Sequence, residues 1–182
     1  MKKLTVKLLV LFVVIAVISG CDILGWQKYA SIEGGFSVYM PAKPTGHKII
    51  LDTAYGQNYL NLFVVNRKDD DLVYSVSFIN CPDALLQAKT ADKILDDARD
   101  GAVKNIQGNL LKETKVSIDN YPGRDLTIES TVGDAVVRAR IYLSKQRLYQ
   151  IMVTTSEKMS KSYNIDKFFN SFKLEDNPKI KR

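Results

Sequence analysis

Residues 135–155 read AVVRARIYLSKQRLYQIMVTT and contain two amphipathic strands joined by a short turn. Apolar side chains recur at every second position in each half: Val137, Ala139, Ile141 and Leu143, then Tyr149, Ile151 and Val153. A period of two is that of a β-strand, because successive side chains point to opposite faces of a sheet. The polar pair Lys145-Gln146 between the halves is short enough to allow only an antiparallel connection. The stretch therefore predicts a β-hairpin within an antiparallel sheet.

Strand-like segments continue on both sides of this hairpin. Seven are expected, at residues 26–31, 36–40, 47–52, 59–66, 72–78, 110–118 and 124–132. The connection before the last of these holds Pro122 and Gly123, which suit the central positions of a type II turn. Pro fixes the φ angle of the first position, and Gly supplies the positive φ angle of the second. We therefore expect the chain to reverse direction within Asn120–Gly123.

Two helical patterns interrupt the strands. Between about Thr90 and Ile106 the apolar residues form a single stripe: Ile94, Leu95, Ala98, Ala102, Val103 and Ile106. Thr90 is suited to cap the start of this helix, and Gly108 is suited to end it. A shorter helix is expected at Asn164–Phe172. The order of elements predicts an α+β fold, in which an antiparallel β-sheet buries one face against one long and one short C-terminal α-helix.

The N-terminus has the three-part layout of an export signal. Met1-Lys2-Lys3 is positive, an uninterrupted apolar run covers Leu8–Ile18, and the small residues Ser19-Gly20 precede Cys21. As a helix the apolar run is about 16 Å long, against a hydrocarbon core of about 30 Å. An uncleaved anchor would have to recruit Leu4–Ile23 and bury a lysine, which is costly. We therefore predict a signal peptide at residues 1–20, cleaved between Gly20 and Cys21.

Ile18-Ser19-Gly20-Cys21 resembles the lipobox of bacterial lipoproteins. The resemblance implies a diacylglycerol thioether on Cys21 and, often, N-acylation after cleavage. Two or more acyl chains hold a protein stably on a membrane, whereas a single chain does not. We therefore expect a lipid-anchored cell-membrane protein that faces the periplasm or the cell exterior. Asp22 suggests retention in the inner membrane if enteric-type sorting applies.

The lipid anchor is followed almost at once by patterned sequence. Residues 21–25 form the lipidated anchor and a short tether before Trp26. The four residues after the anchor, Asp22–Gly25, reach at most about 14 Å when extended. Residues 26–174 are expected to fold as one α+β domain, and residues 175–182 to form a polar basic tail. We therefore expect the domain to lie close to the bilayer.

Charge and cysteine content narrow the class of protein. The formal net charge of +6 falls to +3 once the three lysines of the signal are removed, and the remaining charges are interspersed. This distribution does not suggest a nucleic-acid partner. Cys81 is the only cysteine besides Cys21, so lipidation leaves no pair for an internal disulfide. We expect Cys81 to be buried at the end of a strand.

Four motifs give the chain a resemblance to PsbP/Mog1-like domains, including small bacterial lipoproteins of the DcrB type. They are Gly35–Pro41, Tyr121–Arg124, the hairpin of Arg140–Leu143 with Arg147–Tyr149, and Phe168–Phe172. Their order and spacing cover about Trp26–Leu174. The resemblance implies an α+β sandwich and, since family members are mostly noncatalytic, a role in binding or supporting protein assemblies. No residue set matches a metal or cofactor site of the photosynthetic members.

The sequence contains no catalytic signature. His47 is the only histidine, which removes most acid–base schemes that need two imidazoles. The Gly-x-Ser-x-Gly, Walker and dinucleotide-binding motifs are absent. A thiol dyad of Cys81 with His47 would depend on a chance meeting in the fold. We therefore expect neither an enzyme nor a cofactor or metal site.

An aspartate stripe lies along the predicted long helix. Asp92, Asp96 and Asp100 are spaced four residues apart, so their side chains fall on one face. The stripe suits a cation site or a landing face for a basic partner. It also suits an ordinary solvated face relieved by Lys93 and Arg99, which is the interpretation we favour.

Arg138, Arg140 and Tyr142 share the strand face opposite Val137 and Ala139. If that face is uncovered, these three residues are the best candidates for contact with a partner. An ordinary solvated sheet face would show the same pattern.

These features favour a lipid-anchored, noncatalytic cell-envelope protein that binds, or supports the assembly of, a membrane-associated partner. The partner is expected to be a protein, and the oligomeric state is left open. One alternative is a small-ligand-binding lipoprotein with a pocket between sheet and helix, lined by Tyr142 and Phe169. A third hypothesis is a hydrolase with an unrecognised arrangement around His47 or Cys81.

Overall fold

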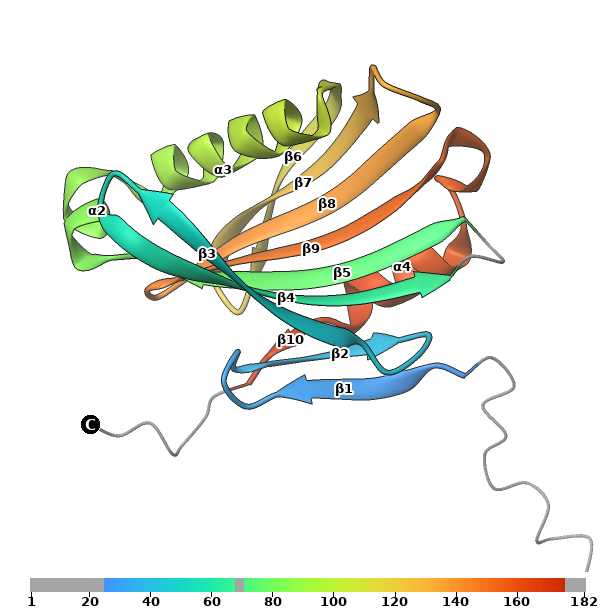
Figure 1. Cartoon of the computed structure of the whole chain (residues 1–182), viewed down its shortest axis with the longest axis horizontal. Helices are drawn as coiled ribbons and strands as arrows, with labels where there is room; N and C mark the ends of the chain where they lie inside the picture. Colours follow the sequence, from blue (N-terminus) through green and yellow to red (C-terminus); the bar gives the residue numbers. More distant parts are fainter. Residues whose placement is uncertain (1–24, 68–70, 176–182) are drawn as a thin grey trace, which may run out of the picture.

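The structure is a computed structural model that describes residues 25–67 and 71–175 (Figure 1). The predictions of a signal peptide at 1–20, of cleavage between Gly20 and Cys21, and of lipid on Cys21 lie outside the described residues. The same holds for the predicted basic tail beyond Glu175. These predictions therefore stay predictions.

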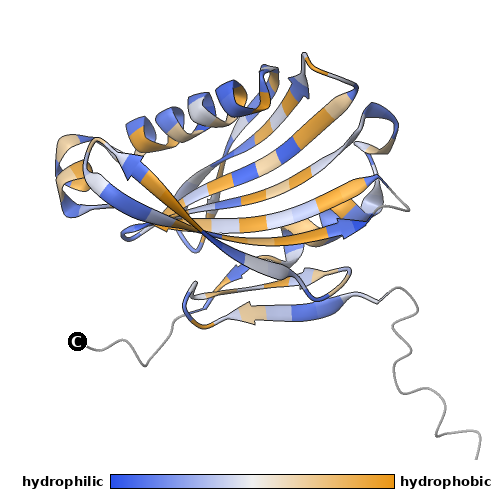
Figure 2. Cartoon of the chain, viewed as in Figure 1, coloured by the Kyte–Doolittle hydropathy of each residue, from blue (hydrophilic) through white to orange (hydrophobic). Residues whose placement is uncertain are grey.

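Seven strands form one antiparallel sheet in the order β3-β4-β5-β9-β8-β7-β6. Their bounds are β3 Thr45–Thr53, β4 Gly56–Arg67, β5 Leu72–Asn80, β6 Gly108–Ile118, β7 Tyr121–Ser130, β8 Ala135–Ser144 and β9 Arg147–Ser156. The predicted hairpin is confirmed, because β8 pairs with β9 in register from Ala135 opposite Ser156 to Ser144 opposite Arg147. The alternation of apolar and polar residues along the strands is visible in Figure 2.

A second, smaller sheet lies against one face of the first (Figure 1). It contains β1 (Gln27–Ser31), β2 (Phe36–Met40) and the two-residue β10 (Lys173–Leu174), in the order β1-β2-β10. The predictions placed the first two strands well but contained no β10, since two residues carry no periodicity. The α+β class is confirmed, with two antiparallel sheets where one was expected.

The helices cover both faces of the large sheet. Helix α3 (Ala91–Ile106) packs on β6, β7 and β8, whereas α4 (Tyr163–Ser171) lies on the opposite face beside the small sheet. The expectation of a single buried face is therefore wrong. A short helix α2 (Asp83–Ala88) and the 3-10 turn η3 (Glu157–Met159) complete the described elements. None of the helices in the described ranges is long and apolar enough to cross a membrane.

Two apolar cores result, one on each face of the large sheet. The core beneath α3 contains Leu126, Ile128, Val137, Ala139, Ile141 and Leu143 with Ile94 and Leu95 of the helix. The core on the other face is rich in aromatic rings, and the fully buried Phe36 contacts Phe63, Phe78, Tyr149 and Phe172. Side chains that alternate along one strand therefore belong to two different cores.

The predicted type II turn at Pro122-Gly123 is wrong. The chain reverses three residues earlier, at Asp119 and Asn120, whose φ angles are 45° and 66°. Two positive φ angles match a type I′ hairpin turn, which fits the twist of the flanking strands and suits Asp and Asn. Pro122 and Gly123 lie inside β7 instead. A Cβ on Gly123 would clash with the carbonyl oxygen of Ile141, so glycine here permits close strand packing.

Candidate functional site

Three hairpin turns and the C-terminal strand meet around a cleft of about 870 Å³ at one end of the domain. The turns are those of β1–β2, β6–β7 and β8–β9, and β10 closes the remaining side. The cleft is lined by Ile32, Glu33, Asp119, Tyr121, Lys145 and Arg147, among others. Loops that a rigid sheet holds together at one end are a common location for binding sites.

Local backbone conformation places these turns. Lys145 adopts a φ angle of 54° in the two-residue turn between Ser144 and Arg147. The β1–β2 turn ends at Gly35, whose φ angle is 63° and whose N–H donates to the carbonyl of Ser31 at 2.8 Å. Residues with positive φ angles allow such tight reversals. The rim of the cleft is therefore built from short turns and not from long loops.

Arg147 ties the small sheet to the large one inside the cleft. Its Nη1 donates to the carbonyl oxygens of Glu33 at 3.0 Å and of Gly34 at 2.7 Å. Its Nε donates to the Asn80 side chain at 2.9 Å, and the guanidinium lies 4.7 Å from the centre of the Phe78 ring. One arginine thus holds the β1–β2 turn against β5 and β9.

Two further side chains brace the same turn and the C-terminal strand. The Tyr149 hydroxyl donates to the carbonyl of Gly34 at 2.7 Å, and burial raises the pKa of Tyr149. The Ser37 hydroxyl donates to the Glu175 carboxylate at 2.6 Å and holds the pKa of Glu175 below its usual range. These contacts keep the base of the cleft rigid and polar.

The cleft mixes charges of both signs with an apolar rim. Glu33, Asp119 and Glu175 contribute acids, Lys145 and Arg147 contribute bases, and Ile32 is 78% exposed at the edge. An exposed apolar residue beside fixed polar groups suits a polypeptide or a small amphipathic molecule. Sequence reasoning missed this site because its residues come from five separate segments. The turn-forming residues Gly35, Asp119, Asn120 and Lys145 were the only local signal in the sequence.

The face that carries Arg138, Arg140 and Tyr142 is covered by α4. Arg138 lies 3.2 Å from Asp166, and Arg140 donates to Asn170 at 3.1 Å, both on α4. Tyr142 is only 6% exposed, and burial raises its pKa. Tyr142 was a candidate for partner contact only if this face was uncovered, and it is covered. Contact of the two arginines with a partner stays a prediction.

The aspartate stripe of α3 faces a buried arginine. Arg124 of β7 is 3% exposed, and its guanidinium lies 2.6 Å from Asp92, 3.2 Å from Asp96 and 3.0 Å from Glu113. Sequence reasoning favoured a solvated face relieved by Lys93 and Arg99, and it missed Arg124. Arg99 does pair with Asp96 and Asp100, whereas Lys93 pairs with Asp97.

This network neutralises the stripe internally. The Arg124 hydrogen bond, followed by that of Lys115, lowers the pKa of Asp92. Within the described ranges no cluster of three or more His, Cys, Asp or Glu side chains is placed to hold a metal ion. The cation that meets Asp92 and Asp96 is thus a residue of the same chain.

The structure does not bring Cys81 and His47 together. Cys81 is buried in the core beneath α3, and burial raises the pKa of its thiol. His47 is exposed on β3, opposite Leu62 of β4. A buried thiol with a raised pKa is a poor nucleophile. The predicted burial of Cys81 is confirmed.

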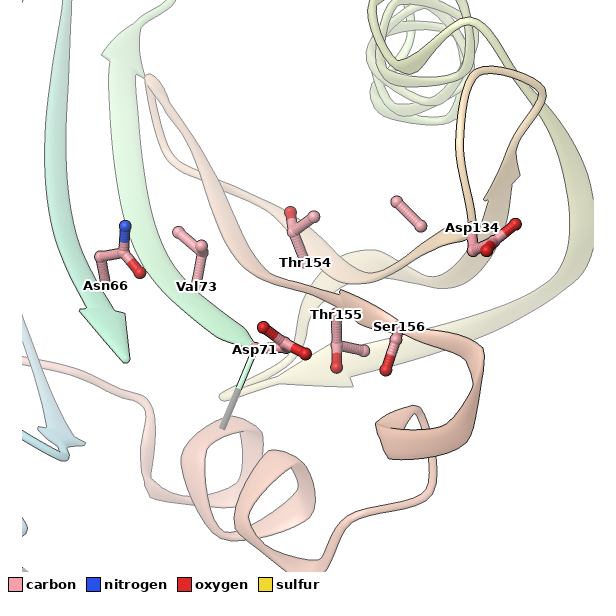
Figure 3. Close-up of a pocket in the computed structure, with 8 residues that line it drawn as sticks. Asn66, Asp71, Val73, Asp134, Thr154, Thr155 and Ser156 are labelled. Carbon is pink, nitrogen blue, oxygen red and sulfur yellow. The ribbon is translucent and has the colours of Figure 1, made fainter. Parts of the chain in front are cut away.

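Figure 3 shows a second hollow, an open groove of about 460 Å³. It is lined by Asn66, Asp71, Val73, Asp134, Ala135, Thr154, Thr155 and Ser156. The two carboxylates lie on opposite sides of the groove, with Thr155 and Ser156 between them. The pocket predicted between Tyr142 and Phe169 is a different place, where both rings are packed in the core.

No protein-family model matches the chain, and no curated protein matches it. The fold is similar to the solution structure of cyanobacterial PsbP (CyanoP) from Synechocystis sp. PCC 6803. The TM-score is 0.58 at 16% sequence identity, and the match covers 86% of this chain and 96% of the cyanobacterial one. This similarity shows the fold alone.

A protein of unknown function, PA94 from Pseudomonas aeruginosa, matches over 62% of this chain and 85% of its own. Its TM-score is 0.39 at 15% sequence identity. Fold and site together define the class: an α+β domain with a PsbP-like fold and a cleft at one end. The resemblance to PsbP-like domains is confirmed at the level of the fold, and the DcrB type stays a prediction.

Proposed function

We propose that this chain is a lipid-anchored, noncatalytic cell-envelope protein that supports a membrane-associated protein partner through the cleft around Arg147. The supporting observation is the course of β1. This strand starts at Gln27, six residues after Cys21, and leads to the β1–β2 turn that lines the cleft at the other end (Figure 1).

The length of β1 sets how far the cleft stands from the anchor. From Gln27 to Ser31 the strand advances by four residues, which at about 3.3 Å per residue is roughly 13 Å. Trp26 is fixed at the start, with its ring 5.6 Å from that of Tyr74 and the Lys167 ammonium 4.7 Å from its centre. A domain held in this way would present the cleft away from the bilayer.

The anchor is tested by Cys21→Ser in the full chain. We expect the variant to remain unprocessed or to leave the membrane fraction, whereas the wild-type chain should incorporate labelled fatty acid. Normal processing together with normal membrane retention of Cys21→Ser would overturn the anchor.

The cleft is tested by site-specific photocrosslinking in intact cells. A photoreactive residue at Ile32 probes the cleft, and the same residue at Tyr163 is the matched control. The two side chains are 78% and 79% exposed. Ile32 belongs to the β1–β2 turn and Tyr163 to the start of α4, and these two places lie at opposite ends of the domain (Figure 1). We expect a discrete crosslinked protein from position 32 that is absent from position 163.

The crosslink from position 32 should also depend on Arg147, which holds the β1–β2 turn at the cleft. Arg147→Ala should lower the crosslink yield from position 32 without changing membrane retention. Equal products from positions 32 and 163, or no product from position 32 in retained protein, would contradict a partner site in the cleft.

The volume of the cleft supports a small-ligand carrier as the second candidate. Ligand sites typically enclose about 300–1,000 Å³, and the cleft holds about 870 Å³. Native mass spectrometry of the purified chain should then detect a bound small molecule that Arg147→Ala loses. Empty protein in every preparation would remove this candidate.

A further inference from the structure

The large sheet has two free edges, β3 and β6, and they differ in how they are protected. The pairing of β6 is broken by a register shift between Leu110 and Lys112, and its Glu113 is held by Arg99 and Arg124. Bulges and lysines are the usual means by which edge strands avoid further pairing. On this edge, local geometry and charge oppose the addition of another strand.

Strand β3 has no bulge along its length, and Lys48 is its one lysine. Its nine residues pair with β4 without any register shift, from Thr45 opposite Val64 to Thr53 opposite Gly56. All of them are exposed except Leu51, which is half-buried. A long, regular and exposed edge strand is a template for another strand.

The free backbone groups of β3 belong to alternate residues. Thr53 and Gly56 close the hairpin across a two-residue turn, so their backbone groups face each other. The backbone N–H and C=O groups of Leu51 and Ile49 point toward β4 in the same way. The N–H and C=O groups of Lys48, Ile50 and Asp52 consequently point outward, to the unpaired edge.

The side chains along this edge are complementary to themselves. The sequence Lys48-Ile49-Ile50-Leu51-Asp52 is reversed in charge about Ile50. Placed against a second, antiparallel copy of itself with Ile50 at the centre, Lys48 meets Asp52 of the second copy, and Asp52 meets its Lys48. Ile49 then lies opposite Leu51 of the second copy on the other face of the sheet.

The charged and apolar groups needed for this pairing are available. Among the described residues neither Lys48 nor Asp52 forms an ion pair, and Lys48 stands over the Tyr59 ring at 4.6 Å. Ile50 is 58% exposed and Ile49 is 40% exposed. A second copy would cover both isoleucines and supply the missing opposite charges.

We infer that two copies of this chain associate through antiparallel pairing of their β3 strands, with Ile50 on the two-fold axis. The central pair Ile50–Ile50 and the two flanking Lys48–Asp52 pairs are the hydrogen-bonded pairs of this ladder. The two seven-stranded sheets become one continuous sheet, and the interface closes on itself as a two-fold axis requires. The pairing depends on β3 alone and does not require the lipid anchor or the cleft.

The register is tested by cysteine pairs in full-length chains, each carrying a different tag and expressed together. Ile49→Cys in one chain and Leu51→Cys in the other would face each other at a Cα separation of about 4.5 Å, within the range of a disulfide. Mild oxidation of membranes should yield the mixed disulfide. Each variant expressed alone, or Lys115→Cys on the β6 edge, should give far less dimer.

Charge reversal tests the Lys48–Asp52 pairing between the two copies. It is introduced into the chains that carry the Ile49→Cys and Leu51→Cys pair. Lys48→Asp or Asp52→Lys alone places like charges opposite each other at two symmetric positions. We expect either change to lower the disulfide yield about tenfold, because each cross-strand pair contributes at both positions. The double exchange Lys48→Asp with Asp52→Lys should restore the yield.

Three results would overturn the proposal. They are an undiminished yield in the single reversals, no recovery in the double exchange, and disulfides from Ile49→Cys to another protein in place of the second copy. Thermal unfolding of each variant shows that its fold is intact. Membrane fractionation of the same cells reports the anchor separately, so failure of one proposal is not mistaken for failure of the other.

Discussion

The guanidinium of Arg124 lies 2.6 Å from the carboxylate of Asp92, and this ion pair joins β7 to the first turn of α3 across 32 residues of chain. Arg124 is almost fully buried, whereas Asp92 keeps contact with solvent. A buried guanidinium must be compensated by opposite charge and hydrogen bonds, which here also come from Asp96 and Glu113. The contact therefore fixes how the helix sits on the sheet.

Arg124→Ala should lower the free energy of unfolding by about 2 kcal/mol, less than for a fully buried pair because the remaining carboxylates reach water. Urea unfolding measures the loss. Lys115→Ala is the control, since Lys115 also contacts Asp92, at 3.4 Å, but its side chain is 74% exposed. Its effect should stay within about 0.5 kcal/mol. Equal effects of the two changes would contradict a special role for Arg124.

Acid should weaken the attachment of α3. The hydrogen bonds of Lys89 and then Lys93 lower the pKa of Asp97, as Arg124 and Lys115 do for Asp92. A lowered pKa in the folded state gives stability that is complete above the ordinary value of 3.8 and is lost as pH falls through the folded value. Thermal unfolding between about pH 5 and pH 2.5 should show this loss. Asp97→Asn should flatten the curve, and an unchanged slope would refute the assignment.

Gly123→Ala and Gly101→Ala should have opposite effects on stability. An added Cβ at Gly123 meets the carbonyl oxygen of Ile141 and the Tyr142 ring, so about 1–3 kcal/mol should be lost to overpacking. At Gly101, within α3, nothing lies within 4 Å, and alanine should add about 0.5–1 kcal/mol through helix propensity. Chemical denaturation of the pair checks both signs.

Cys81 should react with thiol reagents only when the domain opens. Its side chain is 7% exposed and burial raises its pKa, so little thiolate is available in the folded state. We expect modification at least about a hundredfold slower in native protein than in urea. Cys81→Ala provides the blank. Rapid native labelling would show that this end of the sheet is open.

Prediction from sequence succeeded where the pattern is local and long. The bounds of β2, β8 and α3 match the expected segments closely, because a period of two or a single apolar stripe is a property of neighbouring residues. It failed at the Asp119-Asn120 turn, where Pro122 and Gly123 carried a stronger turn signature than the residues that make the turn. The helix at Asp83–Ala88 was missed because six residues are too few to show a period.

The candidate sites were harder to predict than the fold. Arg138 and Arg140 were correctly placed on the strand face opposite Val137. That face is covered by α4, which lies more than twenty residues further along the chain. The cleft around Arg147 depends on the β1–β2 turn, whose carbonyl at Gly34 lies 113 positions away in the chain. Local patterns contain no information about such contacts.

By itself the sequence determined the order and extent of the main strands and of α3, since alternation and helical spacing are set by which neighbouring side chains must leave water. Only the tertiary structure decided that both faces of the sheet are covered, that the aspartates of α3 meet Arg124, and that β3 is the edge strand without a register shift. The physical reason is range. Burial periodicity acts along a few residues, whereas ion pairs, layers and free edges arise from segments that meet only after the chain has folded.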